Sequence, residues 1–215
     1  MEQRTADLAD TRTGRETGGV PALLLKAYDA LREATRLVTV PEGAETETRV
    51  TSYARSLSAL WRDAEDITSL ALGGPSREAD RRSVLAALYV RGDTGRMALL
   101  IEQVGDIAVG RRAQPLAEPV RAPVRELGDA CLHLMAQAHD VLRLSGPPAV
   151  LDQGLADITA RQRRLSRALL TDDLACSVRD AADAAVLGRC HEECAWRTVA
   201  LARTDLQVRE AVARR

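Results

Sequence analysis

The C-terminal part of the chain holds the pattern that most limits its fold. Between residues 174 and 206, mostly small and apolar side chains recur at alternating intervals of four and three: Leu174, Val178, Ala181, Ala185, Gly188, Glu192, Ala195, Val199, Ala202 and Leu206. Beside them runs a second line: Ala184, Leu187, His191, Cys194, Thr198 and Leu201. This spacing predicts one long helix whose first line packs against neighbouring helices. Glu192 and His191 interrupt this face, and a buried carboxylate needs a partner, a water or a metal.

Helical spacing also extends over the rest of the chain. Proline and glycine stop signals separate five further segments: 21–38, 46–72, 77–112, 124–144 and 151–170. Aromatic residues make up only 2% of the chain and Phe is absent, so a Leu, Val and Ala core suits close helix packing. The sequence predicts an all-α fold of six helices in two tandem three-helix bundles. We expect the bundles at 20–114 and 120–210, after a disordered tail at 1–19.

The charge is balanced, with 30 basic and 31 acidic side chains. Nothing in this balance draws the chain to nucleic acid or to an acidic membrane surface. The N-terminus lacks the apolar stretch of a signal peptide, and no apolar run approaches the roughly 18 to 20 residues that span a bilayer. We therefore expect a cytoplasmic protein whose four cysteines are thiols: Cys131, Cys176, Cys190 and Cys194.

The stretch LGRCHEECAW, residues 187–196, contains candidate metal ligands and a candidate Cys–His nucleophile. Zinc requires converging thiolate and imidazole ligands, with Cys176 or Glu192 as further candidates. On a helix, however, His191 points about 100° away from Cys190. We therefore predict neither a zinc site nor a nucleophile here, and expect Cys194 to be a small packing residue. His133 and His139, on the same helix as Cys131, are expected at the edge or surface.

A second acidic candidate lies in IEQVGDIAV, residues 101–109. Glu102 and Asp106 are four residues apart, so their carboxylates share a helix face and could bind a hard cation together. The alternative is a solvated pair of acids that repel slightly, and we favour it.

The segment DAADAAVLGRCHEECAWRTVALAR resembles the third-helix signature of the PhoU family, the phosphate-signalling adaptor proteins. In that signature a Leu-Gly-Arg and two aromatic residues precede Glu-Arg-x-Ala-Asp-His-Ala-Val. Matching positions are Leu187, Gly188, Arg189, Glu192, Ala195 and Val199. Trp196 stands where the signature has its metal-binding aspartate, and Arg197 where it has histidine.

The first half is similar to the same family through TETRVTSYARSLSALW and EADRRSVLAALYV, so that the resemblance covers about Leu23 to Arg203. An ungapped register aligns the first-repeat metal motif with Gly95 and Leu99. A register shifted by seven residues aligns it with Glu102 and Asp106 instead. We prefer the ungapped register, because inserting whole turns into packed helices disturbs their neighbours.

The resemblance implies two three-helix repeats and a cytoplasmic regulatory adaptor that is not an enzyme. Such a protein tunes phosphate uptake and signalling by contacting a phosphate ABC transporter and a sensor histidine kinase. It would form a homodimer and reach the membrane only through its partners. Because the metal motifs are broken, we expect reduced or no metal binding, no cofactor and no catalytic residue, with Trp196 packed between helices. Two alternatives remain: a metal-binding helical protein that uses Glu102, Asp106 and Glu192, and a helical interaction protein without a phosphate role.

Overall fold

The computed structural model describes residues 19–40, 46–72, 78–144, 146–171 and 175–213, without the side chains of 67–72, 78–83 and 212. The predicted disordered tail lies outside these residues, apart from Gly19. Within the described residues the chain forms six helices and no β-strand, which confirms the all-α prediction. The helices are α2 (Val20–Thr39), α3 (Thr46–Leu72), α4 (Glu78–Gly110), α5 (Glu118–Leu144), α6 (Ala149–Leu170) and α7 (Val178–Ala213).

Most predicted helix bounds agree with the structure to within two residues, but α5 begins six residues before the predicted Val124. It starts at Glu118 and continues through Pro123. A proline in a helix removes a backbone donor and costs about 3 kcal/mol. Val120 and Val124, on either side of it, are both fully buried, and burying a valine side chain contributes roughly 1.5 kcal/mol or more. Burial of these two valines offsets the cost of Pro123.

Reciprocal hydrogen bonds cap the N-terminus of α7. The backbone N–H of Asp180 donates to Oγ of Ser177 at 3.1 Å, and the backbone N–H of Ser177 donates to Oδ2 of Asp180 at 3.2 Å. This is a capping box, and it starts the helix at Val178.

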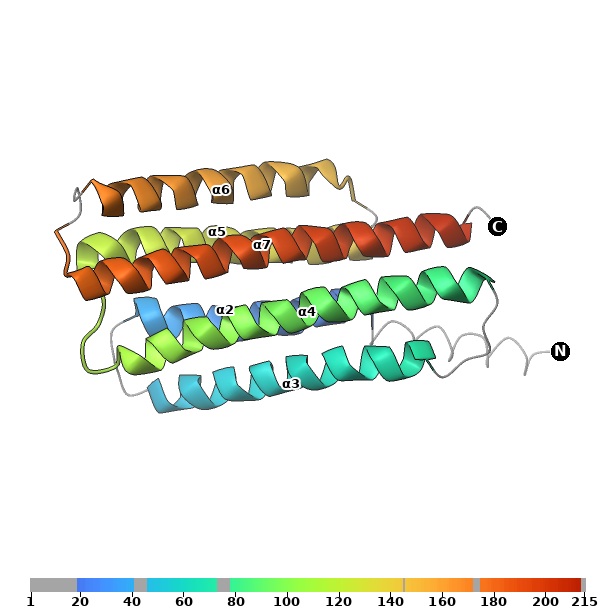
Figure 1. Ribbon diagram of the computed structural model, residues 1–215, viewed down its shortest axis with the longest axis horizontal. Coiled ribbons are helices and arrows are strands. Elements are labelled where there is room, and N and C mark those ends of the chain that lie inside the picture. Colours follow the sequence, from blue (N-terminus) through green and yellow to red (C-terminus); the bar gives the residue numbers. More distant parts are fainter. Residues whose placement is uncertain (1–18, 41–45, 73–77, 145, 172–174, 214–215) are drawn as a thin grey trace.

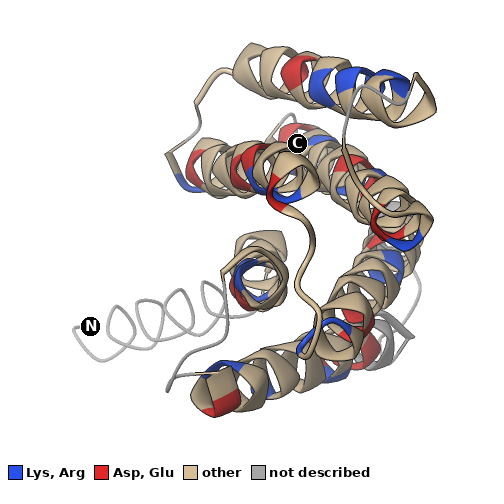
Figure 2. Cartoon of the chain, turned by 90° about the vertical axis from the view of Figure 1, so that its left-hand side faces the viewer, with Lys and Arg blue, Asp and Glu red and all other residues tan. Residues whose placement is uncertain are grey.

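The helices form four layers: α6, then α5 with α7, then α2 with α4, and finally α3 (Figure 1). Helices α2, α3 and α4 contact one another, as do α5, α6 and α7. In addition, α2 packs against α5 and α4 against α7, and one continuous core of buried residues includes side chains from all six helices. Viewed along the helices, both acidic and basic residues lie on most of the helices, whereas basic residues follow one another on α6 (Figure 2).

The deepest line of α7 is the second one read from the sequence, not the first. Its members are all at most 1% exposed: Ala184, Leu187, His191, Cys194, Thr198 and Leu201. On the first line, Val178 and Ala185 are exposed and Leu174 lies outside the described residues. The prediction that the first line packs against neighbouring helices therefore holds for its central part, from Gly188 to Ala202, and is wrong at Val178 and Ala185. A strict spacing of four and three drifts by about 20° per heptad around a straight helix, which turns the ends of a long line away from the core.

None of the described helices combines the length and the apolar character needed to cross a membrane.

Candidate functional site

The centre of the molecule is organised around His191, a fully buried side chain of α7. Its Nδ1 lies 2.7 Å from the carbonyl oxygen of Leu187, and its Nε2 lies 2.9 Å from the hydroxyl oxygen of Thr35 on α2. A carbonyl can only accept, so Nδ1 carries the proton and the Thr35 hydroxyl donates to Nε2. Burial lowers the pKa of His191 from 6.5 to about 4. The ring is therefore neutral near pH 7 and joins α2 to α7.

Gly128 on α5 allows this arrangement to form. A Cβ atom at this position would lie 2.6 Å from Cγ2 of Thr35 and 3.2 Å from Nε2 of His191. Only a residue without a side chain lets α5 approach the Thr35–His191 pair so closely.

Three cysteines lie around the same centre, on α5 and α7. The Cys131 thiol donates to the backbone carbonyl of His191 at 3.2 Å, and the Cys190 thiol lies 3.3 Å from Oε1 of Gln103 on α4. Burial raises the pKa of Cys131 to about 12 and that of Cys190 to about 11, and it raises the pKa of Cys194 well above its usual value. These thiols are protonated near pH 7, whereas nucleophilic attack needs a thiolate.

The predicted divergence of Cys190 and His191 is confirmed, since Cys190 contacts α4 and His191 contacts α2. Among the described residues, no three His, Cys, Asp or Glu side chains form a group that could hold a metal ion. His133 is exposed and His139 is partly exposed beside Asp140, as predicted for edge or surface positions.

Glu192 finds its partner within its own helix. Its side chain, in a residue only 9% exposed, accepts from Nη1 of Arg189 at 3.1 Å. Trp196, one turn further on, is 52% exposed. The prediction that Trp196 packs between helices was therefore wrong. By helix geometry it lies on the side of α7 opposite the line of His191 and Cys194.

Glu102 and Asp106 lie on an exposed face of α4, next to α3. The Tyr53 hydroxyl of α3 donates to the carbonyl oxygens of Ile101 and Glu102, at 3.3 and 3.4 Å. Burial, together with the charges of Asp106 and Glu102, raises the pKa of Tyr53 to about 12. The two acids do not join Glu192 in a metal-holding group. In the preferred, ungapped register, Gly95 lies near Trp61 and Leu99 is exposed.

Ion pairs between α4 and α7 are the feature that the sequence did not indicate. Arg111, at the end of α4, is 6% exposed and contacts Asp180 at 2.8 Å and Asp183 at 2.6 Å. Near the middle of the two helices, Arg197 pairs with Asp93 at 2.7 Å. Arg96 pairs with Glu193 at 3.2 Å. Residues 69 to 104 positions apart form these pairs, so helical periodicity could not reveal them.

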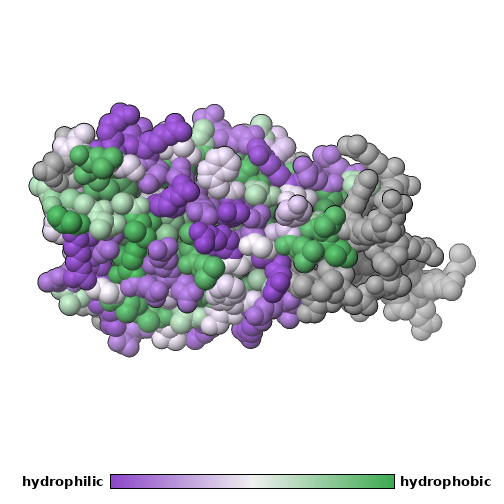
Figure 3. All heavy atoms as spheres, in the orientation of Figure 1, coloured by the Kyte–Doolittle hydropathy of each residue, from purple (hydrophilic) through white to green (hydrophobic). Residues whose placement is uncertain are grey.

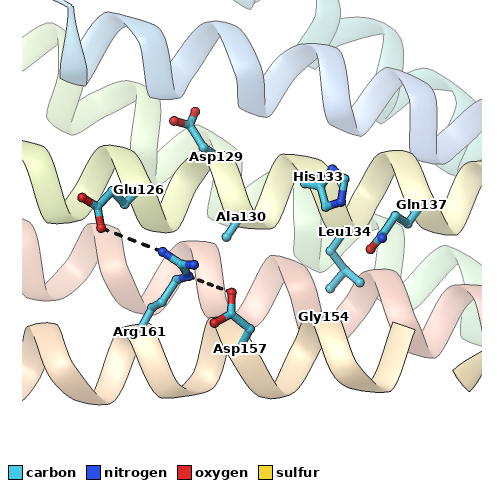
Figure 4. Close-up of a pocket in the computed structure, with 9 residues that line it drawn as sticks. All are labelled: Glu126, Asp129, Ala130, His133, Leu134, Gln137, Gly154, Asp157 and Arg161. Atoms are coloured by element: carbon cyan, nitrogen blue, oxygen red, sulfur yellow. Dashed lines mark hydrogen bonds and ion pairs between the residues drawn. The ribbon is translucent and has the colours of Figure 1, made fainter. Parts of the chain in front are cut away.

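Two grooves flank α5. The one against α6 has a volume of about 370 Å³, and Arg161 spans it, at 2.7 Å from Asp157 and 3.8 Å from Glu126 (Figure 4). This arginine pairs with two of the three carboxylates that line the groove, so the lining keeps a net negative charge. Asp129 and His133 project from the opposite side of α5, where they also line the second groove, against α2.

Exposed apolar side chains mark one outer face. Leu85, Leu88 and Tyr89 on α4 are 44 to 68% exposed, and Leu99 of the same helix is 48% exposed. In the space-filling view, apolar areas lie on both sides of a charged centre on the face that α4 and α7 form (Figure 3). We refer to Leu85, Leu88, Tyr89 and Leu99 and the ion-paired Arg96, Glu193 and Arg197 as the α4–α7 face.

Comparisons with protein-family models, with curated proteins and with solved structures find no match for this chain.

Proposed function

We propose that this chain is a regulatory adaptor that acts by protein–protein contact and carries no catalysis of its own. The observation that carries the proposal is the α4–α7 face. Soluble monomers seldom expose apolar side chains in groups, and such groups mark binding surfaces. Here three large apolar residues of one helix segment, Leu85, Leu88 and Tyr89, are together exposed.

The ion pairs of this face suit a docking surface that keeps its shape. Arg197 contacts both Asp93 and Glu193, and Arg96 contacts Glu193. Side chains held in this way lose little further conformational freedom when a partner binds, so more of the contact energy goes into affinity.

In this proposal the two helix triplets, α2–α4 and α5–α7, are two copies of a PhoU-like three-helix repeat, with bounds near 20–114 and 120–210. The LGR and Glu192 positions of α7 support the resemblance, and Trp196 in place of the aspartate makes the protein a divergent member. The partners are then components of a phosphate ABC transporter and a sensor histidine kinase, and the chain forms a homodimer in the cytoplasm.

Affinity capture from phosphate-replete cells tests the proposal. The tagged wild-type chain is expected to retain transporter or kinase components. The double variant Leu85→Ser/Tyr89→Ser is expected to lose them, because it removes two apolar contacts from the face. Leu144→Ser is the matched control, since Leu144 is 78% exposed at the end of α5, away from the face.

Recovery of neither transporter nor kinase components by the wild-type chain would contradict the phosphate assignment. Equal losses in the double variant and the control would contradict the choice of face. Light scattering on the same three proteins measures the dimer, and a monomeric double variant would show that a second copy occupies the face.

A further inference from the structure

The groove between α2 and α5 has a volume of about 460 Å³ and contains three arginines. Arg32 and Arg36 come from α2, and Arg125 comes from α5. Asp129 is the carboxylate among the residues that line the groove, and Asp29 and Glu33, next to the lining, contact Arg32 and Arg36. We call this site the arginine groove. It shares no residue with the α4–α7 face.

Neighbouring groups hold the two arginines of α2 in place. The Arg32 Nε donates to Oε1 of Glu33 at 3.1 Å, and its Nη2 lies 3.2 Å from Oδ1 of Asp29. Its guanidinium also lies 5.5 Å from the centre of the Tyr28 ring. Arg36 approaches the same Glu33 oxygen at 3.6 Å. A guanidinium has five N–H donors, so these contacts leave donors of both arginines for a ligand.

Arg125 differs from the other two arginines, because it is exposed and has no ion pair with a described residue. Asp129 follows it by one helical turn, yet the two form no ion pair in the structure. Arg125 is therefore a cation without an ion-pair partner in the described part of the chain, in a groove that two further arginines line.

We infer that the arginine groove binds a phosphate group, either free phosphate or the phosphate of a small organic monoester. A planar carboxylate is matched by the fork of a single guanidinium group. Three guanidinium groups on two helices suit an anion with several oxygens and a charge near two, which is the chemistry of phosphate.

The volume of the arginine groove and its apolar lining leave room for the organic group of a phosphate ester. Small-molecule sites occupy roughly 300 to 1,000 Å³, and the arginine groove falls within this range. Leu132 and Ala136 of α5 supply apolar surface next to the Tyr28 ring. A phosphate ester could place its phosphate on the arginines and its organic group on this surface.

Calorimetric titration with inorganic phosphate, AMP and adenosine tests the inference on the full chain. Arg125→Gln is expected to weaken the binding of phosphate and AMP by roughly 10- to 100-fold, because it removes a charged hydrogen-bond donor. Since Arg125 is exposed and unpaired in the fold, this variant should fold as the wild type does, which circular dichroism checks. Arg143→Gln is the matched control, as an exposed arginine of the same helix outside the groove.

The three probes also separate the two sources of the phosphate. AMP binding more tightly than phosphate supports an ester, and equal affinities support free phosphate. Three results would overturn the inference: no binding of phosphate or AMP at millimolar concentration, adenosine binding as tightly as AMP, or equal losses in Arg125→Gln and Arg143→Gln. None of these results depends on the adaptor function, which the capture experiment tests separately.

Discussion

Lowering the pH from about 7 to about 4.5 tests the buried histidine at the centre of the molecule. In the unfolded chain the imidazole of His191 takes up a proton near its ordinary pKa of 6.5, and in the folded chain it does so only near 4. Between these values the unfolded state binds more protons than the folded state. The free energy of unfolding must therefore fall as the pH falls through this window.

The size of the effect follows from the two pKa values. Each tenfold change in proton affinity corresponds to about 1.4 kcal/mol. Lowering the pH from the ordinary pKa of the imidazole to its pKa in the folded chain therefore lowers the free energy of unfolding by about 3 kcal/mol. This is a large part of the roughly 5 to 15 kcal/mol that stabilises a typical domain. The physical cause is loss of water around the charged ring, because His191 is fully buried among α2, α5 and α7, and the nearby charge of Asp129 offsets little of this loss.

Urea unfolding followed by circular dichroism at several pH values measures the effect. The lowered pKa values of Asp180 and Glu193 also contribute stability, which is present above their ordinary pKa and lost as the pH falls below it. Those losses begin only below about pH 4.5. Asp205, whose buried carboxyl has a raised pKa, changes the stability in the opposite direction, so the contribution of His191 between about pH 6.5 and 4.5 is the difference between the wild type and His191→Gln.

His191→Gln is expected to be less stable than the wild type at pH 7 but to lose the pH dependence in this interval. His133→Gln, at an exposed position, is the control and should keep the dependence of the wild type. If His191→Gln and the wild type lose the same free energy between pH 6.5 and 4.5, the reasoning from burial is refuted.

Three further outcomes are expected. Gly128→Ala should lower the free energy of unfolding by about 1 to 3 kcal/mol, because the new methyl group would overlap Thr35. Gly92→Ala meets open space and should raise the free energy of unfolding by up to about 1 kcal/mol. Denaturant unfolding of both variants measures the two changes. Arg111→Gln should cost about 3 kcal/mol by leaving two carboxylates without their cation, and a change in melting temperature no larger than that of Arg55→Gln, at an exposed position, would contradict this. A thiol reagent should label the partly exposed Cys176 in the native protein and reach the three buried thiols only after unfolding, so rapid labelling of all four would disprove their protection.

Helical periodicity was sufficient to predict the all-α fold and most of the helix bounds. The signals are local: Pro21 in the first turn of α2, the Gly and Pro residues after Leu72, and the repeated spacing along α7. Local signals failed at the start of α5, because the burial of Val120 and Val124 decides whether a helix can continue through Pro123.

The sequence also identified His191 and Glu192 as polar residues that need partners, but it could not name the partners. Thr35 lies 156 positions before His191 in the chain. For Trp196, in the same way, the sequence could not predict that the side chain is exposed. Its place in the motif suggested an interhelical position, yet a helix has two sides next to its buried line, and only the approach of neighbouring helices decides which of them is covered.

The sequence by itself therefore determined the helices, the nature of their apolar faces and the residues that could not be buried alone. The tertiary structure decided which line of α7 is deepest, which charges pair between α4 and α7, and that Arg32, Arg36 and Arg125 line one groove. The physical reason is the separation along the chain of the residues that interact. Helix formation depends on residues three and four positions apart, whereas burial, ion pairs and grooves depend on side chains that only packing brings together.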